Sequence, residues 1–193
     1  TPLYLTPSKT KIAIFLTYIQ QTRFNPWQTL FPASSSTFLF DSYSRTQIQK
    51  EMIHFQQAWE QKSFKIALDY LTKILGLGIG LTPTGDDFIT GLLASFSALQ
   101  QLPSNFQQLA VLAKERTNAV SYAEIHEAVN GRFSQLVQRV FLSIESGNTN
   151  EMAQAVSALE EVGSTSGSDI LCGIIFGLKL FCEENNHDNS NSN

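Results

Sequence analysis

The chain has 193 residues, which is long enough for one domain with a substantial hydrophobic core. Apolar residues make up 42% of the sequence and charged residues 16%, which is the balance of a soluble globular protein. The net charge of −4 offers no basic surface for nucleic acid, and the longest apolar run, residues 170–182, is too short to cross a membrane. We therefore expect a cytoplasmic protein that binds neither nucleic acid nor membrane.

The N-terminal portion, residues 1–43, is expected to be less regular than the rest of the chain. It contains one apolar helix, predicted over residues 9–21, followed by prolines and a serine cluster. Thr37–Phe40 combines β-branched and aromatic residues and is predicted to form a short strand.

From Ser44 onward the spacing of apolar residues predicts helices. The predicted helices cover residues 44–62, 65–75, 87–101, 104–130, 132–145, 150–162 and 168–182. The polar tail, residues 183–193, is expected to be disordered. The predicted fold is mainly α: a single helical domain over residues 1–182, with a helical core over 44–182 and a small irregular or β-containing N-terminal portion.

One loop–helix motif occurs twice, at residues 82–93 and 164–175, with a constant offset (167 − 85 = 82). Both copies read hydroxyl, any residue, hydroxyl, Gly, any residue, Asp, two apolar residues, one residue, Gly and two apolar residues. Gly91 and Gly173 lie inside apolar helices, where glycine costs about 1 kcal/mol relative to alanine, so they need a packing reason. We expect the two helices to cross there, about 10 Å apart or less, with the two loops facing each other.

Three interpretations of this motif stay open. The first is a capping box, in which Thr84 with Asp87 and Ser166 with Asp169 only cap their helices. The second is a small-ligand site at the two helix N-termini. The third is an oxyanion site assisted by Mg²⁺ or Mn²⁺, with Asp86, Asp87 and Asp169 as metal ligands. The candidate substrate-binding residues are the hydroxyls and glycines of both loops: Thr82, Thr84, Gly85, Ser164, Thr165, Ser166 and Gly167.

A third polar element lies in the predicted helix over residues 104–130. Thr117, Ser121 and Glu124 fall on its apolar stripe rather than on its polar face. We expect them to line the same cavity as the two loops, with Thr117 and Ser121 binding substrate. The sequence assigns no residue a catalytic role.

Four stretches together resemble the AllH-type family, formerly a domain of unknown function. They are residues 78–88, Arg116-Thr117 with Ser121, Gly131 with Phe133, and residues 163–169. The resemblance implies a subunit of an oxamate carbamoyltransferase that acts in allantoin degradation with AllF-like and AllG-like subunits. The implied chemistry is carbamoyl transfer between oxalurate and phosphate, with a small oxyanion or carbamoyl ligand. The alternative is a non-catalytic helical interaction module in which the duplicated motif is purely structural.

Overall fold

The structure is a computed structural model that describes residues 7–22 and 39–190. Within these residues all regular secondary structure is helical, which confirms the mainly α fold. The helices are α1 (Lys9–Gln21), α3 (Leu39–Glu60), α4 (Phe64–Ile74), α5 (Thr84–Ala98), the 3₁₀ helix η1 (Ser104–Gln107), α6 (Gln108–Arg116), α7 (Ala119–Ala128), α8 (Gln135–Ser146), α9 (Thr149–Glu160) and α10 (Ser166–Ser190). None of the described helices is long and apolar enough to span a membrane.

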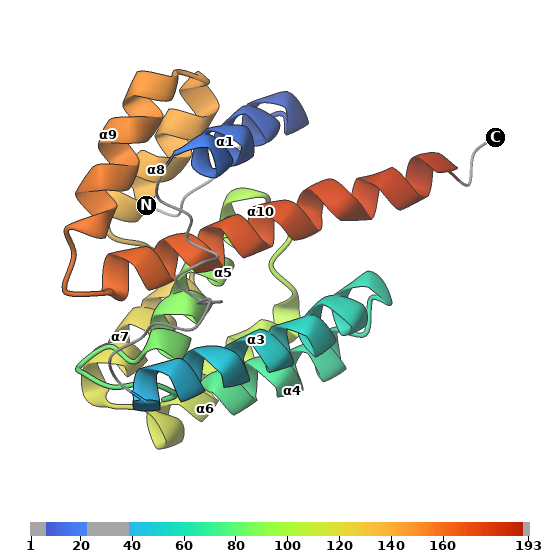
Figure 1. The fold of residues 1–193 in the computed structure, drawn as a ribbon. Helices are drawn as coiled ribbons and strands as arrows, with labels where there is room; N and C mark the ends of the chain where they lie inside the picture. Colours follow the sequence, from blue (N-terminus) through green and yellow to red (C-terminus); the bar gives the residue numbers. More distant parts are fainter. Residues whose placement is uncertain (1–6, 23–38, 191–193) are drawn as a thin grey trace.

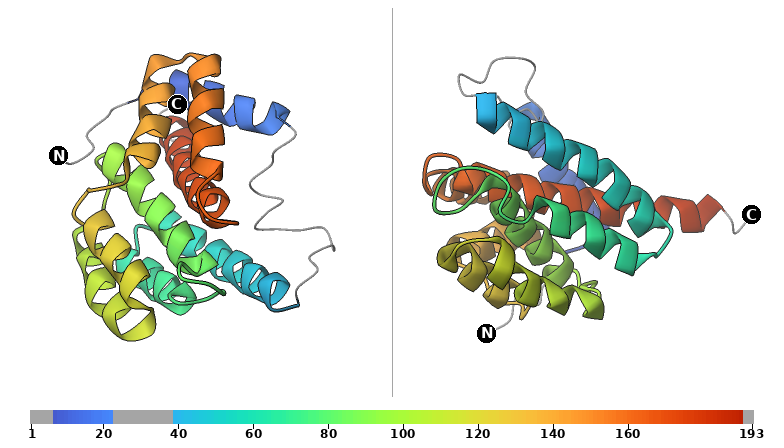
Figure 2. Two further views of the ribbon diagram at one scale, coloured as in Figure 1. Left: turned by 90° about the vertical axis from the view of Figure 1, so that its left-hand side faces the viewer. Right: turned by 90° about the horizontal axis from the view of Figure 1, so that it is seen from below.

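The helices form two groups around a central pair, α5 and α10. In Figure 1, α10 crosses the middle of the molecule, with α1, α8 and α9 on one side and α3, α4, α6 and α7 on the other. Figure 2 shows the same division in a view that foreshortens α10. Each group packs its own apolar cluster against the central pair. As a result, every residue of α5 is buried.

The two copies of the motif meet at Gly91 and Gly173, as predicted. A Cβ atom added to Gly91 would lie 1.9 Å from the carbonyl oxygen of Ile170, and one added to Gly173 would lie 2.1 Å from that of Phe88. Phe88 and Ile170 are themselves equivalent positions of the two copies (170 − 88 = 82). The contacts therefore exchange under a local pseudo-two-fold rotation, and backbone touches backbone at the crossing.

Both ends of the predicted fold need correction, although the N-terminal helix over residues 9–21 is confirmed. The strand predicted over residues 37–40 is wrong in its last two residues, because α3 begins at Leu39; the first two lie outside the described residues. The tail predicted to be disordered is helical over residues 183–190, where α10 continues. In both places the helix continues past the predicted boundary. Each residue added to a helix that has already formed gains one backbone hydrogen bond, and this outweighs weak local preferences for strand or disorder.

The single helix predicted over residues 104–130 is also wrong. The chain forms η1 and α6, leaves the helix at Thr117, whose backbone is extended, and starts α7 at Ala119. The side chain of Asn118 accepts hydrogen bonds from the backbone N–H groups of Val120 and Ser121 and so caps α7. This cap and the turn at Thr117 interrupt an apolar pattern that continues in the sequence.

The glycine crossing predicts a stability effect. Gly91→Ala and Gly173→Ala should each destabilise the protein by about 1–3 kcal/mol, because the new methyl group would overlap a backbone carbonyl across the interface. This loss exceeds the roughly 1 kcal/mol that alanine gains in helix propensity. Chemical denaturation measures the effect, with Ser157→Ala at an exposed position of α9 as the control. Unchanged stability in both glycine variants would contradict the close crossing.

Candidate functional site

The two loops are joined by a direct hydrogen bond. The hydroxyl oxygens of Thr82, in the α4–α5 loop, and Ser166, the first residue of α10, lie 2.6 Å apart. This contact confirms that the two copies of the motif face each other. It joins the first hydroxyl of one copy to the second hydroxyl of the other, and the exchanged pair, Thr84 and Ser164, makes no such hydrogen bond within the described residues, so the pseudo-two-fold relation does not extend into the loops.

Glycines shape the loop that carries Thr82. Gly76, Gly78 and Gly80 have φ values of +72°, +135° and +102°, a region that favours glycine. A Cβ atom on Gly78 would lie 2.5 Å from the backbone nitrogen of Thr84, so the loop folds tightly onto the start of α5. The glycine run therefore serves an unusual backbone conformation that other residues would adopt only with strain.

The capping-box interpretation is wrong for the first copy. The N-cap of α5 is Pro83, and no side chain caps this helix; Thr84 is its first residue. The backbone N–H of Gly85 donates instead to the carbonyl of Leu77, at 2.8 Å, because the glycine-rich loop brings that carbonyl over the helix start. The buried carboxylate of Asp87 is therefore not explained by capping.

Asp86 holds the loop in place. One of its carboxylate oxygens accepts a hydrogen bond from the backbone N–H of Gly76 at 2.7 Å, and the other accepts from the hydroxyl of Thr117. Burial raises the pKa of Asp86, while the bonds from Gly76, Thr117 and Ser121 act in the opposite direction. Both oxygens are thus engaged in tying the α4–α5 loop to the junction of α6 and α7.

Asp87 is in a different situation, although it is equally buried at 1% exposure. Neither of its carboxylate oxygens makes a hydrogen bond of normal geometry within the described residues. Burial raises its pKa to about 8; the nearby hydroxyls of Ser166 and Thr82 lower it, and the charge of Asp169 raises it. A carboxyl group in this environment exchanges its proton near neutral pH.

Asp169 is fully buried in the second copy and acts electrostatically on Asp87. The structure thus brings Asp87 and Asp169 together with the hydroxyls of Thr82 and Ser166, whereas Asp86 is bound elsewhere. In the described part of the chain, no three or more His, Cys, Asp or Glu residues are grouped so that they could hold a metal ion. A metal site formed by all three aspartates stays a prediction.

The remaining loop residues divide into packing and surface positions. Gly85 and Gly167 face backbone carbonyls, with added Cβ atoms 2.0 Å from that of Ile74 and 1.8 Å from that of Leu159, respectively. Thr84 is buried, Thr165 is half-buried, and Ser164 is exposed. Of the candidate substrate-binding residues in the two loops, Thr82 and Ser166 have hydroxyls that act on the carboxyl group of Asp87, and the roles predicted for all of these residues stay untested.

Thr117, Ser121 and Glu124 do not share one helix. They lie beside Asp86 and the α4–α5 loop, and their place in one cavity with both loops stays a prediction. Thr117 binds Asp86, and the hydroxyl of the buried Ser121 donates to the carbonyl of Leu81 at 3.5 Å. The residue Glu124 is exposed overall, but its carboxyl group is partly desolvated. The pKa of Glu124 is raised mainly by burial and to a smaller extent by the charge of Asp86.

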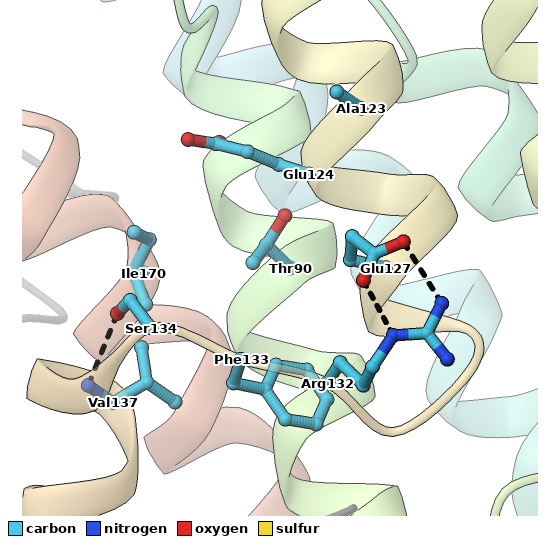
Figure 3. A pocket seen from close by; sticks show the side chains of 9 residues that line it. All are labelled: Thr90, Ala123, Glu124, Glu127, Arg132, Phe133, Ser134, Val137 and Ile170. Carbon is cyan, nitrogen blue, oxygen red and sulfur yellow. Dashed lines mark hydrogen bonds and ion pairs between the residues drawn. The ribbon is translucent and has the colours of Figure 1, made fainter. Parts of the chain in front are cut away.

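Sequence reasoning missed a cavity that begins one helical turn beyond Asp87. Its volume is about 340 Å³, and residues of α5, α7, α8, α10 and the α7–α8 connection line it, including Thr90, Glu124, Arg132 and Ser134 (Figure 3). A faint sequence signal for it exists. Thr90 occupies the unconstrained position of the motif, where it is the one hydroxyl in the apolar stretch of residues 88–94.

A profile of the family described as oxamate carbamoyltransferase subunit AllH matches residues 74–178, which is more than half of the chain. The matched segment contains both copies of the motif, the α4–α5 loop and the cavity. A search of solved structures finds no match.

The raised pKa of Asp87 predicts a pH-dependent stability. Between pH 4 and pH 8 this carboxyl is ionised in the unfolded chain but protonated in the folded one, so stability falls as the pH rises, by up to about 1.4 kcal/mol per pH unit. Asp87→Asn removes this contribution, so the variant should gain stability relative to the wild type as the pH approaches 8. Denaturation at several pH values tests this, with the exposed Asp69→Asn as the control. If the stability difference between Asp87→Asn and the wild type stays constant from pH 4 to pH 8, the raised pKa of Asp87 is contradicted.

Asp86 should respond differently to substitution. Asp86→Ala should cost about 1–3 kcal/mol, because it leaves the N–H of Gly76 and the hydroxyl of Thr117 without their acceptor. Asp86→Asn should retain most of the stability, since its amide can accept from Gly76 and donate to Thr117. Thermal unfolding compares the two variants. Equal losses in both would show that charge, rather than these hydrogen bonds, is what the position requires.

Proposed function

We propose, from the premise that this chain belongs to the family of the oxamate carbamoyltransferase subunit AllH, that it acts as a subunit of a carbamoyl-transferring enzyme. Its task is to hold a small oxyanion or carbamoyl ligand where the two loop copies meet. The AllF-like and AllG-like subunits implied by the sequence resemblance are the proposed partners, and allantoin degradation is the proposed pathway.

The observation that carries this proposal is the buried carboxyl group of Asp87. It lies beside the hydrogen-bonded hydroxyls of Thr82 and Ser166, which lower its pKa, but neither of its oxygens makes a hydrogen bond of normal geometry within the described residues. A buried polar group without partners is costly, and a ligand that supplies them would relieve that cost. The two hydroxyls would position such a ligand. When protonated, Asp87 would donate a hydrogen bond to a ligand oxygen.

A divalent cation is a second part of the proposal. Asp87 and Asp169 with the two hydroxyls form an all-oxygen donor set, which fits Mg²⁺ or Mn²⁺ because these ions accept one or two carboxylates and complete their shell with water and substrate oxygens. The cation would let both carboxylates ionise and would neutralise phosphate or polarise a carbonyl. Asp86 is a weaker candidate ligand, since both its oxygens already accept hydrogen bonds.

The interaction-module alternative also has an observation in its favour. Ile79 and Leu81 in the α4–α5 loop and Val120 at the start of α7 are exposed, and the carbonyl of Leu81 accepts from Ser121 on α7. Apolar side chains around the loop would suit contact with another protein. In this case the glycine crossing would explain the motif without any ligand.

Calorimetric titration separates the two functions. The wild-type chain, with its partner subunits, should bind Mg²⁺ or Mn²⁺ and then phosphate or oxamate at millimolar concentration or below. The double variant Asp87→Asn with Asp169→Asn should lose the cation and the carbamoyl transfer, while Asp69→Asn behaves as the wild type. If the wild-type complex binds neither cation nor anion, the interaction module is the better description.

A further inference from the structure

We propose that the cavity between α5, α7, α8 and α10 binds an organic cation, a guanidinium or primary ammonium group attached to a short apolar chain. The charge and shape of the cavity carry this assignment, and it does not depend on carbamoyl transfer. The volume of about 340 Å³ lies at the lower end of the range for ligand pockets, which suits one such group with its chain. Glu124 and Arg132 line the cavity and are exposed, so a solute can enter without opening the fold.

Thr90 supplies a buried polar atom that faces the cavity. This residue is only 8% exposed, and its hydroxyl has no hydrogen-bond partner within the described residues. A helical threonine usually donates to the carbonyl four residues earlier, as Thr72 does to Leu68 at 2.9 Å. Figure 3 shows the Thr90 hydroxyl pointing toward the side chain of Glu124, which extends from α7 across the cavity. The hydroxyl therefore offers an acceptor to an N–H group placed between the two side chains.

Glu124 supplies a negative charge that no positive charge matches. Its carboxylate makes no hydrogen bond or ion pair with the residues that the structure describes. The pKa of Glu124 is raised by burial and by the charge of Asp86, and the charge of Glu124 in turn raises the pKa of Asp87. These carboxyl groups therefore repel one another when ionised. A cation beside Glu124 would reduce that repulsion.

Arg132 does not provide this cation, although it is the one basic residue among those that line the cavity in the described part of the chain. Its guanidinium donates hydrogen bonds to both carboxylate oxygens of Glu127, and its backbone N–H donates to the Glu127 carbonyl. Figure 3 shows this pair, with the carboxylate of Glu124 directed away from it. The charges of Arg132 and Glu127 cancel, so the charge of Glu124 remains.

The other walls distinguish an organic cation from an anion or a metal ion. The N-terminus of α8 reaches the cavity, but it is capped by the hydroxyl of Ser134, which accepts from the N–H of Val137 at 3.3 Å. In the described residues no three His, Cys, Asp or Glu side chains are grouped to hold a metal. Phe133, Val137 and Ile170 form apolar walls that would cover an alkyl chain. A guanidinium has several N–H donors in one plane, so it could bind Glu124 and Thr90 together.

The test measures binding of n-butylguanidinium to the full chain by calorimetry, in a buffer with EDTA so that no divalent ion contributes. The wild type should bind it at least about tenfold more tightly than n-butylurea, which has nearly the same shape and N–H groups but no charge. Guanidinium without the butyl chain should also bind more weakly, because it leaves the apolar walls uncovered.

Four variants locate the bound cation. Glu124→Gln and Thr90→Val should each weaken binding about threefold to tenfold, since each removes one acceptor and keeps the side-chain shape. Two matched controls make the same changes away from the cavity: Glu115→Gln, at an exposed position of α6, and Thr72→Val. Both controls should keep the wild-type affinity. Thermal unfolding of each variant verifies that it is folded.

Arg132→Gln gives the result of opposite sign. This change releases Glu127 and removes a positive charge, so butylguanidinium should bind more tightly than to the wild type. A site for anions would behave in the opposite way. Weaker binding in Arg132→Gln, equal affinity for butylurea, or an affinity that Glu124→Gln leaves unchanged would each overturn the assignment.

Two sources of the cation are compatible with the cavity: a free metabolite, or an arginine or lysine side chain of a partner subunit. Repeating the titration on the assembled complex distinguishes them. A complex that binds butylguanidinium as tightly as the isolated chain indicates a free compound. A complex that excludes the probe, and that dissociates more readily in the Glu124→Gln variant, indicates a side chain of the partner.

Discussion

The close crossing of α5 and α10 is the constraint on which the rest of the structure depends. Helices usually pack 8–10 Å apart because side chains separate them. At Gly91 and Gly173 there is no side chain, and each glycine faces a backbone carbonyl of the other helix. Both helix N-termini lie within two turns of this point. The approach of the backbones therefore brings Thr82 to Ser166 and places two aspartates in one buried environment.

The same crossing creates an electrostatic cost that the core must offset. Asp87 and Asp169 are both buried, and the charge of Asp169 disfavours ionisation of Asp87. The apolar cluster beside them is rich in aromatic residues, with Trp59 and Phe96 stacked at 4.2 Å between ring centroids. Burial of such rings contributes several kcal/mol, which lets the fold tolerate a carboxyl group that stays protonated near neutral pH. Asp86 offsets part of its own burial cost through its hydrogen bonds.

The repeated motif predicted the helix contact and the facing loops because its offset and its glycines are explicit in the sequence. The partners of Asp86 could not be predicted, since Gly76 and Thr117 reach it only after the loop folds back and the chain breaks between α6 and α7. That break was hidden by apolar spacing that runs through it. Asn118 was the available cap signal, but only the tertiary contact of Thr117 shows why the helix ends there.

The two copies of the motif differ at positions that contribute to the site and to the cavity. Asp86, which holds the α4–α5 loop, has Ser168 as its counterpart, and Thr90, which faces the cavity, has Cys172. An exact two-fold would bury two identical, mutually repelling sites side by side. Divergence instead gives α5 the loop-holding carboxylate and the cavity hydroxyl, one turn apart on a helix that is buried throughout. The duplicated loop–helix motif forms the scaffold. The differences between its two copies place the loop-holding carboxylate and the cavity hydroxyl on α5 alone.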